Sequence, residues 1–207
     1  MKRKVWLYLI FFAVLFGAFY VFLLAMIDSS KSLLPVLNAV KPFSFERQDE
    51  QIITEKDVAG KVYVAEFFFS TCDGICPRMN RNMKTVSDRF RNEHDFLILS
   101  HTVDPDTDNA ARLKVYADSL GANINKWWFL TGSKEDLYKA ARESYILDDP
   151  NNHAANVDEQ FLHTQFFALI DKNGKVRGVY DGLKKDEIEK LTTDIKDLLK
   201  EKYQGSV

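Results

Sequence analysis

The chain has 207 residues, of which 46% are apolar and 13% aromatic, enough for one sizeable core and too many for a wholly disordered protein. Nine glycines and five prolines without a triplet period exclude a collagen-like chain, and two cysteines are too few for a disulfide-stapled scaffold or a four-cysteine zinc site. A net charge of −2 lacks the basic excess of a nucleic-acid-binding protein, so we expect no nucleic-acid partner.

The N-terminus carries a segment that can cross a bilayer. Residues 5–27 contain no charge and no proline, and roughly 20 apolar residues in a helix span the hydrocarbon core. Lys2, Arg3 and Lys4 precede them, and positive charge stays on the cytoplasmic side. We therefore expect residues 1–4 to be a cytoplasmic tip, the apolar run to be an uncleaved anchor in the cell inner membrane, and the rest to lie outside the cytoplasm. The alternatives are a cleaved signal peptide, whose apolar core is usually only ~7–15 residues long, and a buried helix of a soluble protein.

The part after the anchor is mildly acidic. The first 27 residues hold three of the 28 basic residues and none of the 30 acidic ones, so the remainder carries a net charge of −5, which is ordinary for a soluble domain. We expect residues 28–41 to be a tether and residues 42–203 to form one domain. Outside the cytosol, a pair of thiols is oxidised unless a reductant or a metal intervenes.

The domain is predicted to alternate strands and helices and to end in a hairpin and a helix. Runs of β-branched and aromatic residues indicate strands, and apolar residues at three- and four-residue spacing indicate helices. In chain order, the predicted elements are a hairpin over 43–53, a strand over 61–69, a helix over 77–91, a strand over 95–103, a helix capped by Asp106 or Thr107 and ending at Leu120, a strand over 127–130, a helix over 133–144, a polar loop over 148–160, a hairpin of 165–171 and 175–180, and a helix over 184–200. This order predicts an α/β fold whose mixed sheet is flanked by helices.

The two cysteines carry the candidate chemistry. Cys72 and Cys76 have the spacing C-x-x-x-C and are followed by Pro77, between the exit of the 61–69 strand and the next helix. Proline suits the first helical position, and the partial positive charge of a helix start lowers the pKa of a thiol. We expect the two sulfurs to close a disulfide, as a redox-active pair, or to hold a soft metal together. An inert disulfide is the alternative, although a bridge that closes so few residues removes little unfolded-state entropy.

The chemistry depends on a third ligand. Two thiolates alone favour redox chemistry, whereas two thiolates and an imidazole suit Cu(I). His163 lies just before the late hairpin, at a junction that could face the cysteine loop. The other candidates are expected to be structural or solvated: His101, Met79 and Met83 in the core, and His94 and His153 in solvent.

Four motifs in this order resemble those of the SCO/SenC family, whose members are membrane-anchored proteins with a thioredoxin-like fold. The resemblance covers about residues 42–200. Asp73 follows the first cysteine where the family usually has proline, and Leu162 precedes the histidine where it often has aspartate. The motifs are C-x-x-x-C-P at 72–77, D-P-x-x-D at 104–108, W-x-x-L-x-G at 127–132, and the histidine His163 before a strand that ends in D-x-x-G at 171–174.

The resemblance implies a copper site, for Cu(I) or Cu(II), formed by Cys72, Cys76 and His163. It also implies a metallochaperone, rather than an enzyme, that delivers copper to the dinuclear copper centre of cytochrome c oxidase or reduces the cysteines of that centre. Its partners would be the copper-bearing subunit of the oxidase and a thioredoxin-like reductant or copper donor. Two other hypotheses remain open: a thiol–disulfide oxidoreductase without a metal, in which Cys72 attacks and Cys76 resolves, and a copper sensor that acts on a partner.

Overall fold

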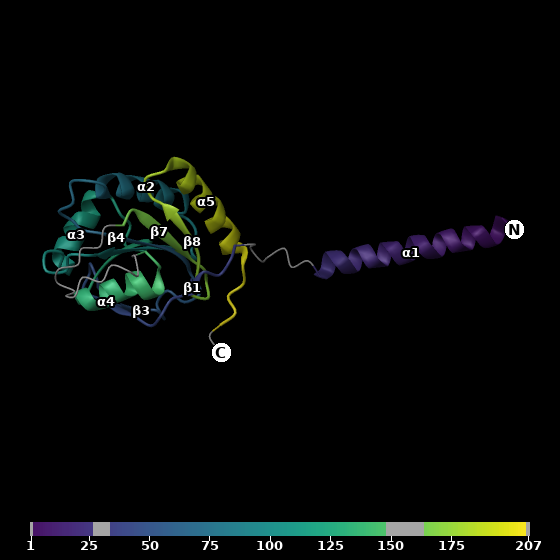
Figure 1. Ribbon diagram of the computed structural model, residues 1–207, viewed down its shortest axis with the longest axis horizontal. Helices are drawn as coiled ribbons and strands as arrows, with labels where there is room; N and C mark the ends of the chain where they lie inside the picture. Colours follow the sequence, from purple (N-terminus) through teal and green to yellow (C-terminus); the bar gives the residue numbers. More distant parts are fainter. Residues whose placement is uncertain (1, 27–33, 148–163, 206–207) are drawn as a thin grey trace.

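The computed structural model describes residues 2–26, 34–147 and 164–205. Helix α1 (Lys2–Met26) extends away from an α/β domain that contains all the other described elements (Figure 1). The side chains described along α1 are exposed, and its stretch Lys4–Phe22 is long and apolar enough to cross a membrane. Membrane anchors and signal sequences share this composition. The predicted N-terminal apolar helix is therefore confirmed.

The domain is built on one sheet of eight strands in the order β1-β8-β7-β4-β5-β6-β2-β3. The sheet is mixed, as the sequence predicted. Its inner strands β4, β5 and β6 run parallel, and every other neighbouring pair is antiparallel. The strands are β1 (Asn38–Ala39), β2 (Ser44–Arg47), β3 (Ile52–Thr54), β4 (Val62–Phe68), β5 (Phe96–Thr102), β6 (Trp127–Thr131), β7 (Phe166–Ile170) and β8 (Lys175–Asp181).

The parallel strands form because their sequences suit burial on both faces. Every residue of β4, β5 and β6 is buried. A strand covered on both faces needs a nearly continuous apolar run, and the predicted runs over 61–69 and 95–103 supply it. The observed strands are shorter than these predictions by one residue at each end.

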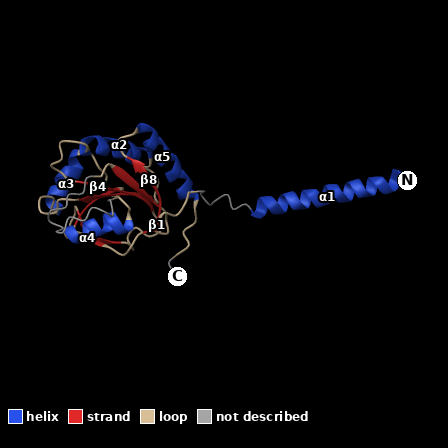
Figure 2. Cartoon of the chain, viewed as in Figure 1, coloured by secondary structure: helices blue, strands red, loops and turns tan. Residues whose placement is uncertain are grey.

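Helices cover both faces of the sheet (Figure 2). Helices α2 (Cys76–Arg89), α3 (Ala110–Ser119) and α5 (Lys185–Lys200) pack on one face, where they share a core with Cys76. Helix α4 (Lys134–Lys139) and the π-helical turn η1 (Ala140–Ser144) pack on the other face. The domain therefore has two cores, separated by the sheet.

The predicted cap of α3 is wrong. Asn109, and not Asp106 or Thr107, caps this helix, and its Oδ1 accepts a backbone N–H from the first turn at 3.0 Å. The preceding segment forms a turn of its own, in which the backbone N–H of Asp108 donates to the carbonyl of Asp104 at 2.9 Å. This turn delays the start of the helix.

Three smaller differences concern element ends. The helix predicted over 133–144 has the expected cap at Ser133 but widens into the η1 turn. Helix α2 begins at Cys76, so Pro77 is its second residue and not its first. The segment expected to be a tether contributes the two-residue strand β1, which pairs with β8 and is too short to show a periodic pattern.

Candidate metal centre

Cys72 and Cys76 lie where the chain passes from the sheet to the first helix of the domain. Strand β4 ends at Phe68, and α2 begins at Cys76 itself. Between them the chain turns back, and the backbone N–H of Cys72 donates to the carbonyl of Phe69 at 3.2 Å. Both cysteines are free thiols, and Cys72 packs against the buried cluster that contains Cys76. Cys72 is partly exposed and Cys76 is only 4% exposed, so a ligand or partner reaches the pair from the side of Cys72.

The Cys76 thiol has a raised pKa, contrary to the expectation from its position at a helix start. Burial is the main cause, and the neighbouring Cys72 side chain adds to it, so that together they raise the pKa of Cys76 to about 12. A backbone hydrogen bond from Phe69 acts in the opposite direction and is outweighed. Helix-terminus electrostatics favour a thiolate, but the loss of hydration in the core costs more here.

The described histidines are structural or solvated, as predicted. His101 is fully buried on the face of the sheet opposite to Cys76, where its ring stacks on Phe67 at 4.9 Å between centroids. Burial lowers the pKa of His101 to about 4, which keeps the ring neutral. The side chain of His94 is 91% exposed and lies 3.0 Å from a carboxylate oxygen of Asp95. His153 lies outside the described residues.

The two methionines of α2 belong to the core and not to a metal site. Met79 and Met83 are fully buried under this helix, and they pack in the same cluster as Cys76. Their helical spacing correctly predicted a packing role.

The predicted third ligand, His163, lies outside the described residues. Its place beside the two cysteines therefore stays a prediction. In the described part of the chain, no three His, Cys, Asp or Glu side chains gather closely enough to hold a metal ion. The residue after His163, Thr164, is described and buried just before β7. Strand β7 runs antiparallel to β4, with Ala168 opposite Ala65, so β7 begins at the end of the sheet where β4 leads to the cysteines. Once deprotonated, the two soft sulfurs of this loop fit Cu(I) as two of its ligands.

Glu66 is a buried polar residue beside this site that the sequence did not single out. It lies inside β4 on the face of Cys76 and is fully buried. Its Oε1 accepts a hydrogen bond from the Ser100 hydroxyl at 2.5 Å, whereas its Oε2 has no partner among the described residues. Burial raises the pKa of Glu66 to about 7. The signal for it was present: one acidic residue inside the apolar run of residues 61–69.

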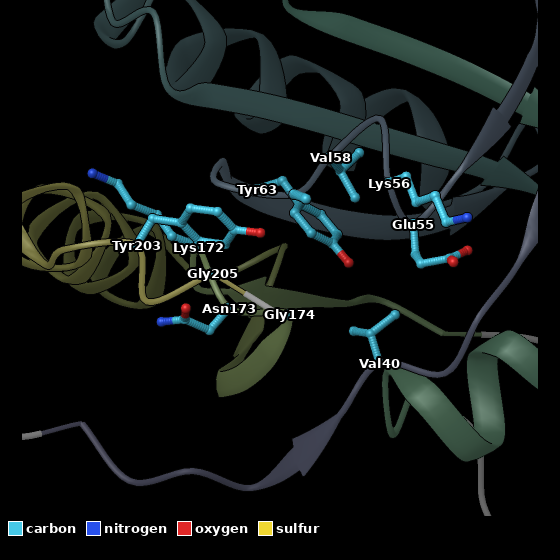
Figure 3. A pocket seen from close by; sticks show the side chains of 11 residues that line it. Val40, Glu55, Lys56, Val58, Tyr63, Lys172, Asn173, Gly174, Tyr203 and Gly205 are labelled. Atoms are coloured by element: carbon cyan, nitrogen blue, oxygen red, sulfur yellow. The ribbon is translucent and has the colours of Figure 1, made fainter. Parts of the chain in front are cut away.

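A cavity of about 380 Å³ lies at the opposite end of β4 (Figure 3). Tyr63, near the start of this strand, points its hydroxyl toward the cavity, with Glu55 and Lys56 to one side and Tyr203 to the other. Its described lining contains no cysteine or histidine. The cavity is therefore separate from the candidate metal centre.

Comparison with known proteins identifies the family of this chain. The family model described as SCO1/SenC matches residues 34–200, which is most of the chain and nearly all of the domain. The chain belongs to the SCO1/SenC family. This confirms the resemblance seen in the four sequence motifs, and the solved structures of the family confirm the thioredoxin-like α/β fold.

Three solved structures illustrate the similarity. A SCO1/SenC family lipoprotein from Bacillus anthracis str. Ames is 34% identical, with a TM-score of 0.69 over 81% of this chain and 99% of that one. BsSco, described as a member of the Sco family of cytochrome c oxidase assembly proteins with a disulfide switch, is 29% identical, with a TM-score of 0.69 over 83% and 100%. Yeast Sco1 with copper bound is 26% identical, with a TM-score of 0.57 over 78% and 94%.

Proposed function

We propose that this protein is a membrane-anchored copper carrier in which Cys72, Cys76 and His163 hold the ion. It delivers copper to the dinuclear copper centre of cytochrome c oxidase, or reduces the cysteines of that centre. The observation that carries the proposal is the pair of free cysteines in one loop, with Cys72 packed against the cluster that contains Cys76, at the end of the sheet where β7 begins. The copper-bound structure of yeast Sco1 and the assembly role stated for BsSco support it.

The chain supplies two soft donors in a site that is open on one side only. Cys76 is anchored in the core, whereas Cys72 is partly exposed. Binding of the ion requires that both thiols lose their protons, so the affinity rises with pH. The exposed edge of Cys72 gives a partner direct access to the ion or to the sulfur.

A second candidate function is thiol–disulfide exchange without a metal, and two free cysteines placed together beside one core favour it. In this reaction the Cys72 thiolate attacks a partner disulfide and releases one partner thiol. Cys76 then attacks the mixed disulfide and releases the second, so the partner gains two electrons and two protons while the Cys72–Cys76 bond forms. The disulfide switch described for BsSco supports this candidate.

The proposed location follows from α1. Helix α1 is proposed to remain as a single-span anchor in the cell inner membrane, with Lys2, Arg3 and Lys4 in the cytoplasm and the domain outside it. The proposed partners of the domain are then extracytoplasmic. They are the copper-bearing subunit of the oxidase, and a thioredoxin-like reductant or copper donor.

The variant His163→Ala separates the two candidate functions, and His94→Ala is its control because His94 is exposed and outside the site. A copper carrier needs the third donor, so His163→Ala should weaken Cu(I) binding by about 10–100-fold, abolish stable Cu(II) binding, and impair copper-dependent oxidase assembly. An exchange enzyme needs only its sulfurs, so both variants should retain the thiol–disulfide cycle. Normal oxidase assembly by a His163→Ala protein that no longer binds copper would favour thiol exchange, and full copper binding would remove His163 from the site.

A further inference from the structure

The D-P-x-x-D motif of the sequence ends in a buried aspartate that contacts the cysteine loop. Asp108 is fully buried, and its Oδ2 accepts the backbone N–H of Ser70 at 2.9 Å and the hydroxyl of Thr102 at 2.7 Å. The Ser70 hydroxyl donates to its Oδ1. Ser70 stands two residues before Cys72, so this carboxylate holds both the main chain and the side chain of the segment that leads to the first thiol.

An arginine completes the arrangement. The Nε of Arg112, in the first turn of α3, donates to the Ser70 hydroxyl at 2.6 Å and lies 3.5 Å from Oδ1 of Asp108. Ser70 is thus both a donor to the carboxylate and an acceptor from the arginine. The buried charge of Asp108 has a positive group nearby and several donors, which is the condition under which a buried carboxylate is tolerated.

The position of this arrangement in the sheet gives it a specific consequence. The pairing of β4 with β5 ends at Phe68 and Thr102, and after it the Ser70 N–H no longer has a neighbouring strand to pair with. The carboxylate of Asp108 accepts this N–H instead of a backbone carbonyl of a neighbouring strand. The chain therefore leaves the sheet at a fixed point and in a fixed direction, and Cys72 follows directly.

We propose that Asp108 is a positioning residue for the Cys72–Cys76 pair, acting through Ser70. It touches neither sulfur and sets how closely the Cys72 sulfur is held to that of Cys76. This inference deepens the proposed function, because it assigns a role to that same pair, but it requires only that the two thiols exchange with a disulfide. Loosening the loop raises the entropy cost of bringing the sulfurs together and so lowers their effective concentration.

The test is the equilibrium of the full-length, detergent-solubilised protein with glutathione. One oxidised glutathione and the two protein thiols give the protein disulfide and two reduced glutathiones, and alkylation of the remaining thiols measures the ratio. We expect Asp108→Asn to lower the equilibrium constant for disulfide formation about tenfold, because the amide nitrogen cannot accept the donors that the carboxylate accepts. Ser70→Ala should shift the constant in the same direction by less.

Two matched variants show whether the effect is specific. Asp106→Asn changes an exposed aspartate of the same turn, and Asp171→Asn changes another buried aspartate, which accepts hydrogen bonds from two backbone N–H groups and Arg177 far from the cysteines. Both should leave the equilibrium constant unchanged, although Asp171→Asn lowers the melting temperature. An equal shift in Asp171→Asn, or no shift in Asp108→Asn and Ser70→Ala, would overturn the positioning role.

Two further outcomes are decided by the same set of proteins. If Asp108→Asn does not fold, Ser70→Ala alone decides, and an unchanged constant in that variant refutes the inference. If the wild-type protein binds no copper, the copper-carrier proposal fails, while the shift in the glutathione equilibrium still supports the positioning role of Asp108.

Discussion

A buried aspartate lies near each end of strand β4, and the surroundings of the two aspartates differ. At the cysteine end, Asp108 accepts hydrogen bonds from the loop that follows β4 and lies near Arg112. At the other end, Asp171 accepts the backbone N–H groups of Asn173 and Lys175, both at 2.9 Å, and a hydrogen bond from Arg177 at 2.8 Å.

The difference lies in what each aspartate holds. Asp171 closes a tight turn, in which Gly174 adopts a φ of +70°, and the chain returns directly into β8. Asp108 instead holds a loop that leaves the sheet and leads to a partly exposed thiol. The same hydrogen-bonding chemistry thus stabilises the fold at one end and orders a reactive loop at the other. Changes at the two ends should therefore separate stability from copper and thiol chemistry.

The largest expected effect is at the cysteine end. Cys76→Ser replaces a soft sulfur by a hard oxygen at the buried position of the pair and should lower Cu(I) affinity by more than ~100-fold, because even changes around a metal ligand cost 10–100-fold. Competition with a chromophoric Cu(I) chelator measures this loss. Thr85→Ser, an exposed change on α2, is the control. If Cys76→Ser binds Cu(I) as the wild type does, Cys76 is not a ligand.

A change at the opposite end of β4 should alter the stability of the fold and leave the affinity for Cu(I) unchanged. Asp171→Asn removes the charge that faces the nearly buried Arg177 and should lower the free energy of unfolding by about 3–5 kcal/mol. Urea denaturation measures this change, and Cu(I) competition should give the wild-type affinity. A large loss of affinity in a protein that remains folded would show that the two ends are coupled.

Glu66 lies between the two ends and should make stability depend on pH. Because its folded pKa is raised from 4.5 to about 7 by burial, the folded state binds this proton more tightly than the unfolded state. The stabilisation is complete below the unfolded pKa and is lost as the pH rises through about 7. From pH 4 to pH 8, the wild type should therefore lose about 3 kcal/mol relative to Glu66→Gln, which has no such proton.

Urea unfolding of both proteins at several pH values measures this difference. Glu93→Gln is the control, because Glu93 is exposed. A constant difference between wild type and Glu66→Gln across this pH range would mean that Glu66 titrates near its ordinary value.

The sequence predicted the features that depend on runs and spacing. The apolar runs over 61–69 and 95–103 and the paired spacing of Cys72 and Cys76 are local patterns, and the structure realises them as buried strands and as two free cysteines beside one core. The mixed sheet followed from the order of these elements. The family resemblance rested on motifs of the same local kind.

The features that were missed depend on contacts between distant segments. Asp106 or Thr107 was expected to cap α3, but Asn109 does so, because the segment before it forms its own turn and Asp108 is occupied by Ser70 and Thr102. The raised pKa of Cys76 follows from its burial at the start of α2 in the core beside the sheet, which spacing does not reveal. Glu66 was visible as a single acidic residue in an apolar run, but the sequence gives no indication of its partner Ser100, which lies on β5.

Cu(I) titration of the full-length protein in its dithiol and disulfide forms shows whether Cys72 and Cys76 hold the ion, since a disulfide removes both thiolates at once. With bound metal counted after dialysis, we expect one Cu(I) per reduced chain and far weaker binding by the oxidised chain. Equal binding by the two forms would mean that residues other than Cys72 and Cys76 hold the ion.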